Sequence, residues 1–173
     1  MKVLGSHMLF VGLVVFLTAA VIEDLVRRRI SNVLTFGAAL LGLGLQFIAN
    51  GPDGVVNGLG GFAVGLGIFL PFFLLGGMGA GDVKAMAAAG AFLTPWSSLL
   101  AAGLSLVGGS VFGLALLTWR GGLADMFRVW SLRLIVADRT ARPDMPPAAT
   151  MRFPYALAIA AGTLGAVAWL GSR

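Results

Sequence analysis

The chain has 173 residues, of which 58% are hydrophobic and 11% are charged, and its formal net charge is +5. A soluble domain carries about 25% charged residues, so this composition is typical of a membrane protein. There is no cysteine and a single histidine, His7, which excludes a disulfide framework, a Cys/His zinc site and a cysteine nucleophile.

The first seven residues have the pattern of an expression-tag remnant. Gly5-Ser6-His7-Met8 resembles the scar of a cleaved cloning tag, so we take Met8 as the native start. His7 is then no catalytic candidate. We expect residues 8–173 to form a single membrane domain.

Six apolar stretches follow along the chain, and a helix needs about 20 such residues to cross a bilayer. We expect spans at about 9–25, 32–49, 55–75, 83–93, 97–119 and 154–170. The Arg triplet 27–29 ends the first span, and the turn-forming residues 50–54 separate the second from the third. The fourth span is short and begins after Asp82. The predicted fold class is an all-α polytopic membrane protein with six transmembrane helices.

A polar segment at about 120–152 is predicted to be a cytoplasmic loop. Within it, residues 123–137 are apolar but carry Asp125, Arg128 and Arg133. Charges near the centre of a membrane span are costly, so a helix lying in the membrane interface is favoured over a seventh span.

The basic residues predict the orientation. With six spans, ten of the twelve Lys and Arg residues fall on one side, and only Lys2 and Arg173 on the other. The ten are Arg27, Arg28, Arg29, Lys84, Arg120, Arg128, Arg133, Arg139, Arg142 and Arg152. Positively charged loops face the cytoplasm, which places both termini outside a bacterial inner membrane. The positive charge thus indicates topology and not nucleic-acid binding.

Among the seven acidic residues, Asp24 and Asp82 are the catalytic candidates. Asp24 ends an inward-going span and Asp82 precedes an outward-going one, so both are expected at the cytoplasmic edge at similar depth. Ionisable groups at membrane depth are expensive and usually functional. Two carboxylates that share a proton can activate a water and protonate a leaving amine, without metal or cofactor. This pair predicts an intramembrane aspartic peptidase.

Each aspartate also has a simpler interpretation. Asp24 could pair with Arg27 or Arg28 on one helix face, and Asp82 could be the N-cap of the fourth span. A small transporter or channel that binds cations or protons through both residues is the alternative function, although it favours carboxylates near the membrane midplane.

The motifs around these aspartates resemble those of the type IV prepilin peptidase family, in its short form that serves Flp-type (tight-adherence) pili. Asp24 is followed after five residues by Ile30-Ser31-Asn32, where the family has Ile-Pro-Asn. Gly79-Ala80-Gly81-Asp82-Val83-Lys84 matches the family's Gly-x-Gly-Asp-x-Lys, and a late Pro-Tyr recurs as Pro154-Tyr155. The resemblance extends over residues 8–170. Because Ser31 stands where the family has proline, the turn lacks the rigid proline of the family.

The resemblance implies a reaction and a substrate. The enzyme would cut the short basic leader from a prepilin at the cytoplasmic membrane face, with Asp24 and Asp82 as the catalytic pair and with no cofactor. Longer relatives also N-methylate the trimmed pilin and carry a Cys-x-x-Cys pair in an extra domain. This chain has neither, so leader cleavage without methyl transfer is expected. The expected partners are the prepilin and the lipid bilayer. Whether the protein forms a homo-oligomer is left open by the sequence.

Six further residues are candidates for binding substrate or supporting the site. Gly79 and Gly81 would let a substrate backbone approach. Lys84 would either anchor at the lipid headgroups or tune Asp82 and contact substrate. Glu23 points about 100° away from Asp24, as a headgroup-level charge or a secondary contact. The other two are Asn32, a candidate cap of the second span, and Tyr155, whose hydroxyl could serve the site although an interfacial aromatic belt is the simpler role.

Overall fold

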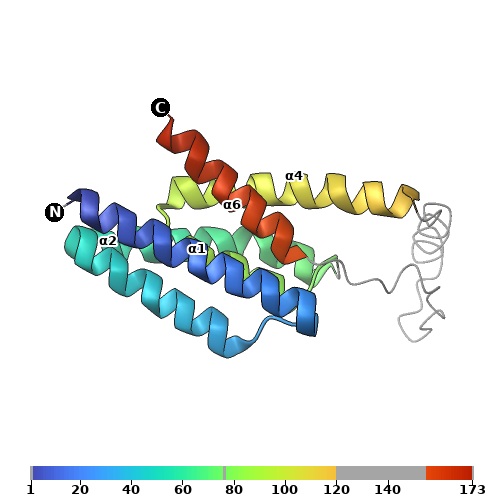
Figure 1. Cartoon of the computed structure of the whole chain (residues 1–173), viewed down its shortest axis with the longest axis horizontal. Coiled ribbons are helices and arrows are strands. Elements are labelled where there is room, and N and C mark those ends of the chain that lie inside the picture. Colours follow the sequence, from blue (N-terminus) through green and yellow to red (C-terminus); the bar gives the residue numbers. More distant parts are fainter. Residues whose placement is uncertain (1, 76, 120–154, 173) are drawn as a thin grey trace. The chain divides into compact units, whose positions relative to one another are not determined.

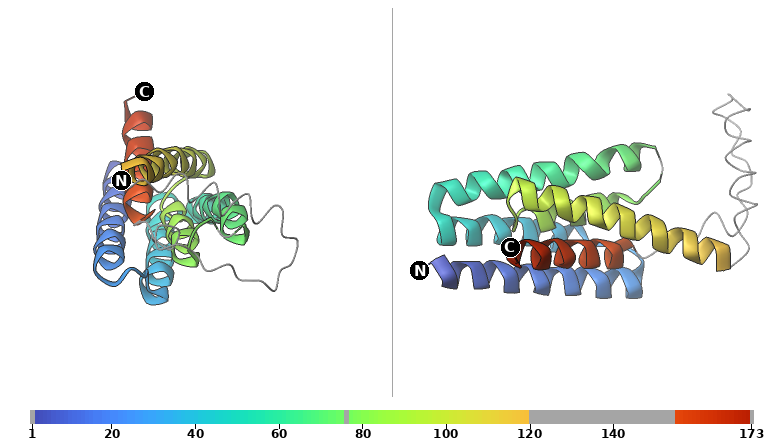
Figure 2. Two further views of the ribbon diagram at one scale, coloured as in Figure 1. Left: turned by 90° about the vertical axis from the view of Figure 1, so that its right-hand side faces the viewer. Right: turned by 90° about the horizontal axis from the view of Figure 1, so that it is seen from above.

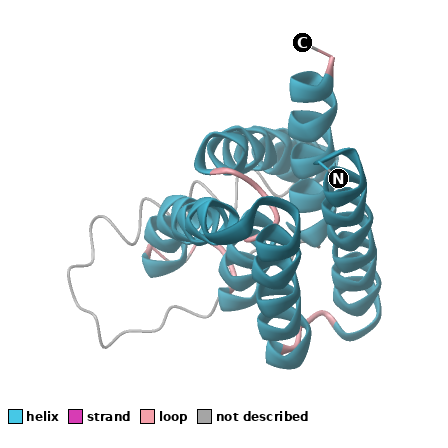
Figure 3. Ribbon diagram, turned by 90° about the vertical axis from the view of Figure 1, so that its left-hand side faces the viewer, coloured by secondary structure: helices cyan, strands magenta, loops and turns pink. Residues whose placement is uncertain are grey.

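The computed structural model describes residues 2–75, 77–119 and 155–172, and these fold entirely into helices and short loops (Figure 3). The all-α prediction is confirmed for this part of the chain. The helices are α1 (Lys2–Arg27), α2 (Asn32–Leu74), α3 (Ala80–Gly90), α4 (Pro95–Trp119) and α6 (Tyr155–Gly171). All of them except α3 are labelled in Figure 1. The predicted loop at 120–152 and its interfacial helix at 123–137 lie outside the described residues.

Three of these helices are long and apolar enough to cross a membrane. Their spanning segments are Gly5–Arg27, Asn32–Leu74 and Pro95–Ala115, and α6 is a shorter apolar helix. Large apolar side chains such as Val33 and Leu75 remain 85% and 81% exposed, whereas many core residues are alanines. An apolar exterior around a core of small residues is the pattern of helices packed in lipid. The protein is therefore membrane-embedded.

The helix α1 begins earlier than the predicted first span. It continues through residues 2–7, which we interpreted as a tag remnant, and ends at Arg27. Arg28 then adopts a left-handed backbone with φ of 51°, and its N–H donates to Asp24 O at 2.8 Å. This is a helix stop of the αL type, at the Arg triplet that the sequence predicts as the end of the span.

The 43-residue helix α2 is a hairpin of two helical legs and not one straight rod. Gly51 leaves the helical conformation with φ of 66° and ψ of −150°, and the chain reverses there (Figure 2, right). Pro52 follows at the first position of the second leg, where its missing N–H costs nothing. The predicted turn is thus confirmed but narrower than expected, since only Gly51 departs from helical geometry. Asp53 is exposed beside it.

The helix α3 lies among the other helices and is too short to span a bilayer alone. Its 11 residues extend about 16 Å at 1.5 Å per residue, roughly half of a 30 Å hydrocarbon core. Seven of them are buried, from Val83 and from Ala85 to Gly90. It packs mainly on α2 and also contacts α1 and α6. Apart from its first residues, α3 therefore contacts protein more than lipid.

Glycines of the second α2 leg bring its backbone onto α3. A Cβ at Gly61 would meet the carbonyl oxygens of Gly90 and Leu93, and one at Gly65 would lie 2.7 Å from Met86 O. Gly58 approaches Ala91 O in the same way. Small residues allow such close helix approach in membranes, so the glycine-rich stretch 58–67 serves tight packing at these three positions.

Serines connect α4 and α6 to this core. Ser98 of α4 donates to Gly61 O at 2.8 Å, and Ser105 donates to Ala101 O at 2.6 Å and to Ile159 O of α6 at 3.5 Å. A Cβ at Gly162 of α6 would clash with Ser105. These contacts lie within one compact unit, residues 1–109 and 154–173, while residues 110–153 form another. In the same unit α6 also contacts α1, and its first residues lie beside the end of α1, where the Ala156 N–H reaches Asp24.

Candidate active site

The last turn of α1 carries two carboxylates that point to different partners. Glu23 Oε2 accepts the backbone N–H of Ser31 at 2.9 Å, and Glu23 Oε1 lies 3.6 Å from Arg27 Nη1. Asp24 Oδ2 accepts the backbone N–H of Ala156 at 3.4 Å, at the start of α6. Glu23 is thus a contact to the α1–α2 turn. Arg27 pairs with Glu23, not with Asp24 as the simpler interpretation would have it.

Asp82 lies in the first turn of α3, but not at the position that the sequence suggested. The N-cap is Gly79, with φ of −80° and ψ of 151°, and Asp82 is the third helical residue. Its Oδ2 accepts the N–H of Gly79 at 3.1 Å, while its own N–H donates to Gly79 O at 3.1 Å. The N-cap prediction for Asp82 is therefore wrong, and its carboxylate instead reaches back as in half of a capping box.

The structure brings Asp24 and Asp82 within electrostatic range of each other. The pKa of Asp82 is raised to about 6, mainly by burial; the hydrogen bond from Gly79 opposes this rise and the charge of Asp24 adds to it. Asp82 lies outside the three candidate spans. A carboxyl with this pKa holds its proton at mildly acidic pH, as one member of a proton-sharing pair must.

Tyr155 forms a third side of the site. Its ring packs edge-on against Phe69 with centroids 6.1 Å apart, and its hydroxyl interacts electrostatically with Asp82. The next residue, Ala156, is the one that contacts Asp24. Tyr155 is half-buried inside the unit, which favours a contribution to the site over the interfacial belt.

Lys84 and Asn32 contact each other across the site. Lys84 Nζ donates to Asn32 Oδ1 at 2.9 Å, which joins the start of α3 to the start of α2. Asn32 is the first helical residue of α2, and the cap is Ser31, whose Oγ accepts the Leu34 N–H at 3.3 Å. The predicted capping role of Asn32 is therefore wrong. Ser31, which replaces the family's proline, caps the helix.

The two motif glycines have different surroundings. A Cβ at Gly79 would lie 3.2 Å from Asp82 Oδ2, tighter than an ordinary contact. A Cβ at Gly81 would lie 3.5 Å from Ile30 Cβ, in ordinary contact with the α1–α2 turn. Gly79 thus leaves room for the Asp82 carboxylate, and Gly81 lets the α1–α2 turn and α3 approach each other.

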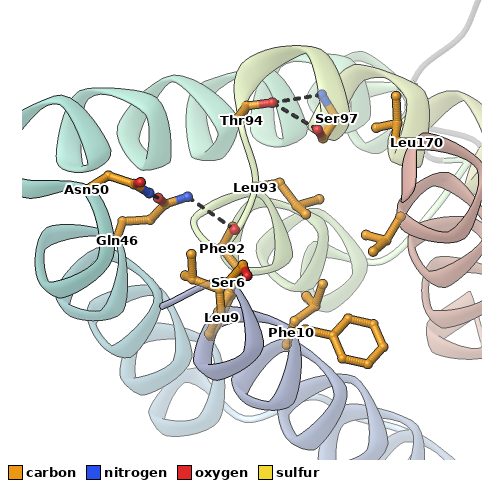
Figure 4. A pocket seen from close by; sticks show the side chains of 12 residues that line it. Ser6, Leu9, Phe10, Gln46, Asn50, Phe92, Leu93, Thr94, Ser97 and Leu170 are labelled. Carbon is orange, nitrogen blue, oxygen red and sulfur yellow. Dashed lines mark hydrogen bonds between the residues drawn. The ribbon is translucent and has the colours of Figure 1, made fainter. Parts of the chain in front are cut away.

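A cavity of about 250 Å³ lies elsewhere in the unit. It is lined by the first half of α1, the α2 bend, the α3–α4 loop, the start of α4 and the end of α6, and its polar lining includes Gln46 and Asn50 (Figure 4). Its α1 lining ends at Leu13, which precedes Asp24 by 11 residues, or about 16 Å of helix. This cavity is separate from the carboxylates and adds no residue to the candidate site.

The backbone contact from Ala156 to Asp24 is the part of the site that residue patterns missed. Side-chain motifs do not show which main-chain N–H will face a carboxylate. The one signal that could have located it was the Pro154-Tyr155 pair at the start of the last helix.

Comparison with known proteins gives the family. The sequence model of the type IV leader peptidase family matches residues 11–115. No curated protein and no solved structure matches the chain. The fold and this match together define a membrane-embedded peptidase, and hence a hydrolase acting on protein. The chain belongs to the type IV leader peptidase family. Both aspartates lie within the matched residues, whereas α6 lies beyond them.

Proposed function

We propose that this protein is an intramembrane aspartic endopeptidase that removes the basic leader peptide from type IV prepilins. The observation that carries the proposal is the juxtaposition of Asp24 and Asp82. Asp24 ends α1, Asp82 starts α3, and the charge of Asp24 acts on Asp82. Both aspartates belong to segments matched by the leader peptidase family.

The chemistry follows from two carboxylates that share one proton. The ionised carboxylate takes a proton from a bound water while the water oxygen attacks the scissile carbonyl carbon. The protonated carboxyl gives its proton to the carbonyl oxygen. When the C–N bond breaks, the leaving amine takes a proton from the pair and a hydroxyl of the tetrahedral intermediate gives one to the pair, which again holds a single shared proton. We assign the proton in the resting pair to Asp82, because burial raises its pKa to about 6.

Asp24 is then the ionised partner. The backbone N–H of Ala156 donates to its Oδ2 at 3.4 Å, which holds this carboxylate at the start of α6. Because neighbouring carboxyls titrate as a pair, the assignment describes the predominant arrangement of one shared proton.

The membrane placement is part of the proposal. The six crossings would be α1, the two legs of α2, α4, α6 and the part of α3 after Asp82, which would be a short span enclosed by its neighbours. The end of α1, the start of α3 and the start of α6 would face the cytoplasm, because ten of twelve basic residues fall on that side. A basic leader would be cut there, at the inner membrane, while the pilin's apolar helix stays in the bilayer.

The proposal narrows the substrate to Flp-type prepilins and excludes methyl transfer. The chain contains no cysteine, whereas the methylating relatives implied by the resemblance carry a Cys-x-x-Cys pair. The test is reconstitution of the purified protein in liposomes with a Flp-type prepilin. Mass spectrometry should show the leader removed at a single bond, and added S-adenosylmethionine should leave the mature pilin mass unchanged. An intact prepilin would contradict the proposed leader cleavage, and a methylated product would contradict the proposed lack of methyl transfer.

A further inference from the structure

We propose that Lys84 and Asn32 are positioning residues that hold the two proposed catalytic aspartates in register through the α1–α2 turn, residues 28–31. This inference rests on the proposed function, because it concerns the geometry of that pair. The contact that carries it is the hydrogen bond from Lys84 Nζ to Asn32 Oδ1, 2.9 Å long between residues 52 positions apart.

The α1–α2 turn is held from the Asp24 side by the residue next to Asp24. Glu23 Oε2 accepts the N–H of Ser31 at 2.9 Å, and Glu23 is mostly buried, with its side chain 16% exposed. Hydrogen bonds to a charged group of this kind are among the stronger ones in proteins. The turn therefore moves with the end of α1, and with it the backbone of Asp24.

The same turn is held from the Asp82 side by the residues that flank Asp82. Gly81 lies in van der Waals distance of Ile30, with the Cβ of an added side chain 3.5 Å from Ile30 Cβ. Two residues after Asp82, Lys84 bonds to Asn32. Contacts on both sides of Asp82 thus end on Ile30 of the turn and on Asn32, the α2 residue that directly follows the turn.

The turn itself is stiff enough to transmit position. Ser31 Oγ caps α2 through the Leu34 N–H at 3.3 Å, and Arg28 N–H closes the end of α1 on Asp24 O at 2.8 Å. Since the turn has only four residues between two capped helices, it has little freedom to absorb a shift. Lys84 and Asn32 then set the separation of the carboxylates, and a misplacement of about 1 Å can cost roughly 100-fold in rate.

This role differs from the other roles open to a lysine at this place. A headgroup anchor would not need Asn32. A residue that tunes the Asp82 charge would act through its own charge and not through a neutral amide. A substrate contact would affect binding. Each of these three roles predicts a different effect of the variants on kcat, KM and the pH dependence of cleavage.

The test compares Lys84→Met, Asn32→Ala and the double variant in the liposome cleavage assay. Each single variant should lower kcat by about 10- to 100-fold with KM changed less than twofold, and the double variant should be no slower than the slower single variant, because both remove one contact. Asn57→Ala removes an exposed amide outside both this contact and the turn, and should match the parent protein.

Rescue and pH dependence separate positioning from other roles. Asn32→Asp keeps an acceptor for Lys84 and should retain at least about half of the parent kcat, which also shows that the position tolerates change. The pH profiles of Lys84→Met and Asn32→Ala should have the same midpoint as the parent. A shifted midpoint in Lys84→Met with a normal rate in Asn32→Ala would overturn the proposal in favour of charge tuning. A rise in KM alone would overturn it in favour of substrate contact.

A distance measurement tests the inference without activity. The chain has no native cysteine, so spin labels attach only at the cysteines introduced by Val26→Cys and Ala80→Cys. The distance between the labels reports the separation between the end of α1 and the start of α3. Both positions are exposed. The distance distribution should broaden in Lys84→Met and Asn32→Ala and stay narrow in Asn57→Ala. An unchanged distribution in the first two variants would overturn the positioning role, even if an inactive parent protein had already refuted the peptidase.

Discussion

At the scale of single residues, the site is defined by what each carboxylate contacts. Asp24 and Glu23 are neighbours in sequence, yet Glu23 bonds to Ser31 and Asp24 to Ala156. Adjacent helical residues point about 100° apart, so one can hold a turn while the other faces Asp82. The third carboxylate, Asp82, is held by Gly79 within its own helix turn.

The raised pKa of Asp82 predicts the pH dependence of cleavage. Burial places that pKa at about 6 instead of its usual 3.8. Because the protonated form is the active one in the proposed pair, kcat/KM should fall as the pH rises through about 6, and a profile of initial rates against pH would show it. A rate that keeps rising through this range would contradict the assignment of the proton to Asp82.

The variant Gly79→Ala sharpens this pH test. Its new Cβ would lie 3.2 Å from Asp82 Oδ2, so the carboxylate should move and lose the hydrogen bond that lowers its pKa. The alkaline midpoint should then shift upward. Gly37→Ala, where a Cβ would meet nothing within 4 Å, is the matched control and should keep the parent midpoint.

At the scale of elements, α3 is the piece around which the others are arranged. It is short, it carries Asp82 in its first turn, and seven of its residues are buried by α2 and by neighbouring helices. The second α2 leg fits against it through Gly58, Gly61 and Gly65. The packing of small residues therefore fixes the depth of Asp82 as much as the motif itself does.

The substitution Gly61→Ala tests this packing. A Cβ at Gly61 would collide with the carbonyl oxygens of Gly90 and Leu93, and since these are backbone atoms the helices must separate. Overpacking of this kind costs about 1–3 kcal/mol, so the midpoint of thermal unfolding in detergent should fall. Gly67→Ala on the same leg faces open space and should leave the midpoint unchanged or slightly raise it. Equal midpoints for the two variants would contradict the close packing.

At the scale of the whole molecule, the sequence predicts the helical class and the proximity of the two aspartates well. Both follow from strong signals, namely long apolar stretches, the Arg triplet after Asp24 and the Gly-x-Gly-Asp motif. These signals are local or depend on the simple alternation of membrane spans. The turn at Gly51 belongs to the same class of signal.

The details that sequence did not predict depend on tertiary contacts. The cap of α2 is Ser31 and not Asn32, and Asp82 occupies the third position of α3 and not the cap. Both differences are shifts of one to three residues, which propensity alone does not resolve. The bond from Ala156 to Asp24 joins residues 132 positions apart, and only the packing of α6 beside α1 creates it.

The central claim, that Asp24 and Asp82 act together as a catalytic pair, is tested most directly by cleavage of a co-reconstituted prepilin. Asp24→Asn and Asp82→Asn each keep the size of the side chain and remove the shared proton chemistry, so each should lower the rate at least about 100-fold. The matched control is Asp53→Asn, at the exposed α2 bend, which should cleave at the parent rate. Full activity in either Asp24→Asn or Asp82→Asn, in protein with the parent helical content, would contradict the account.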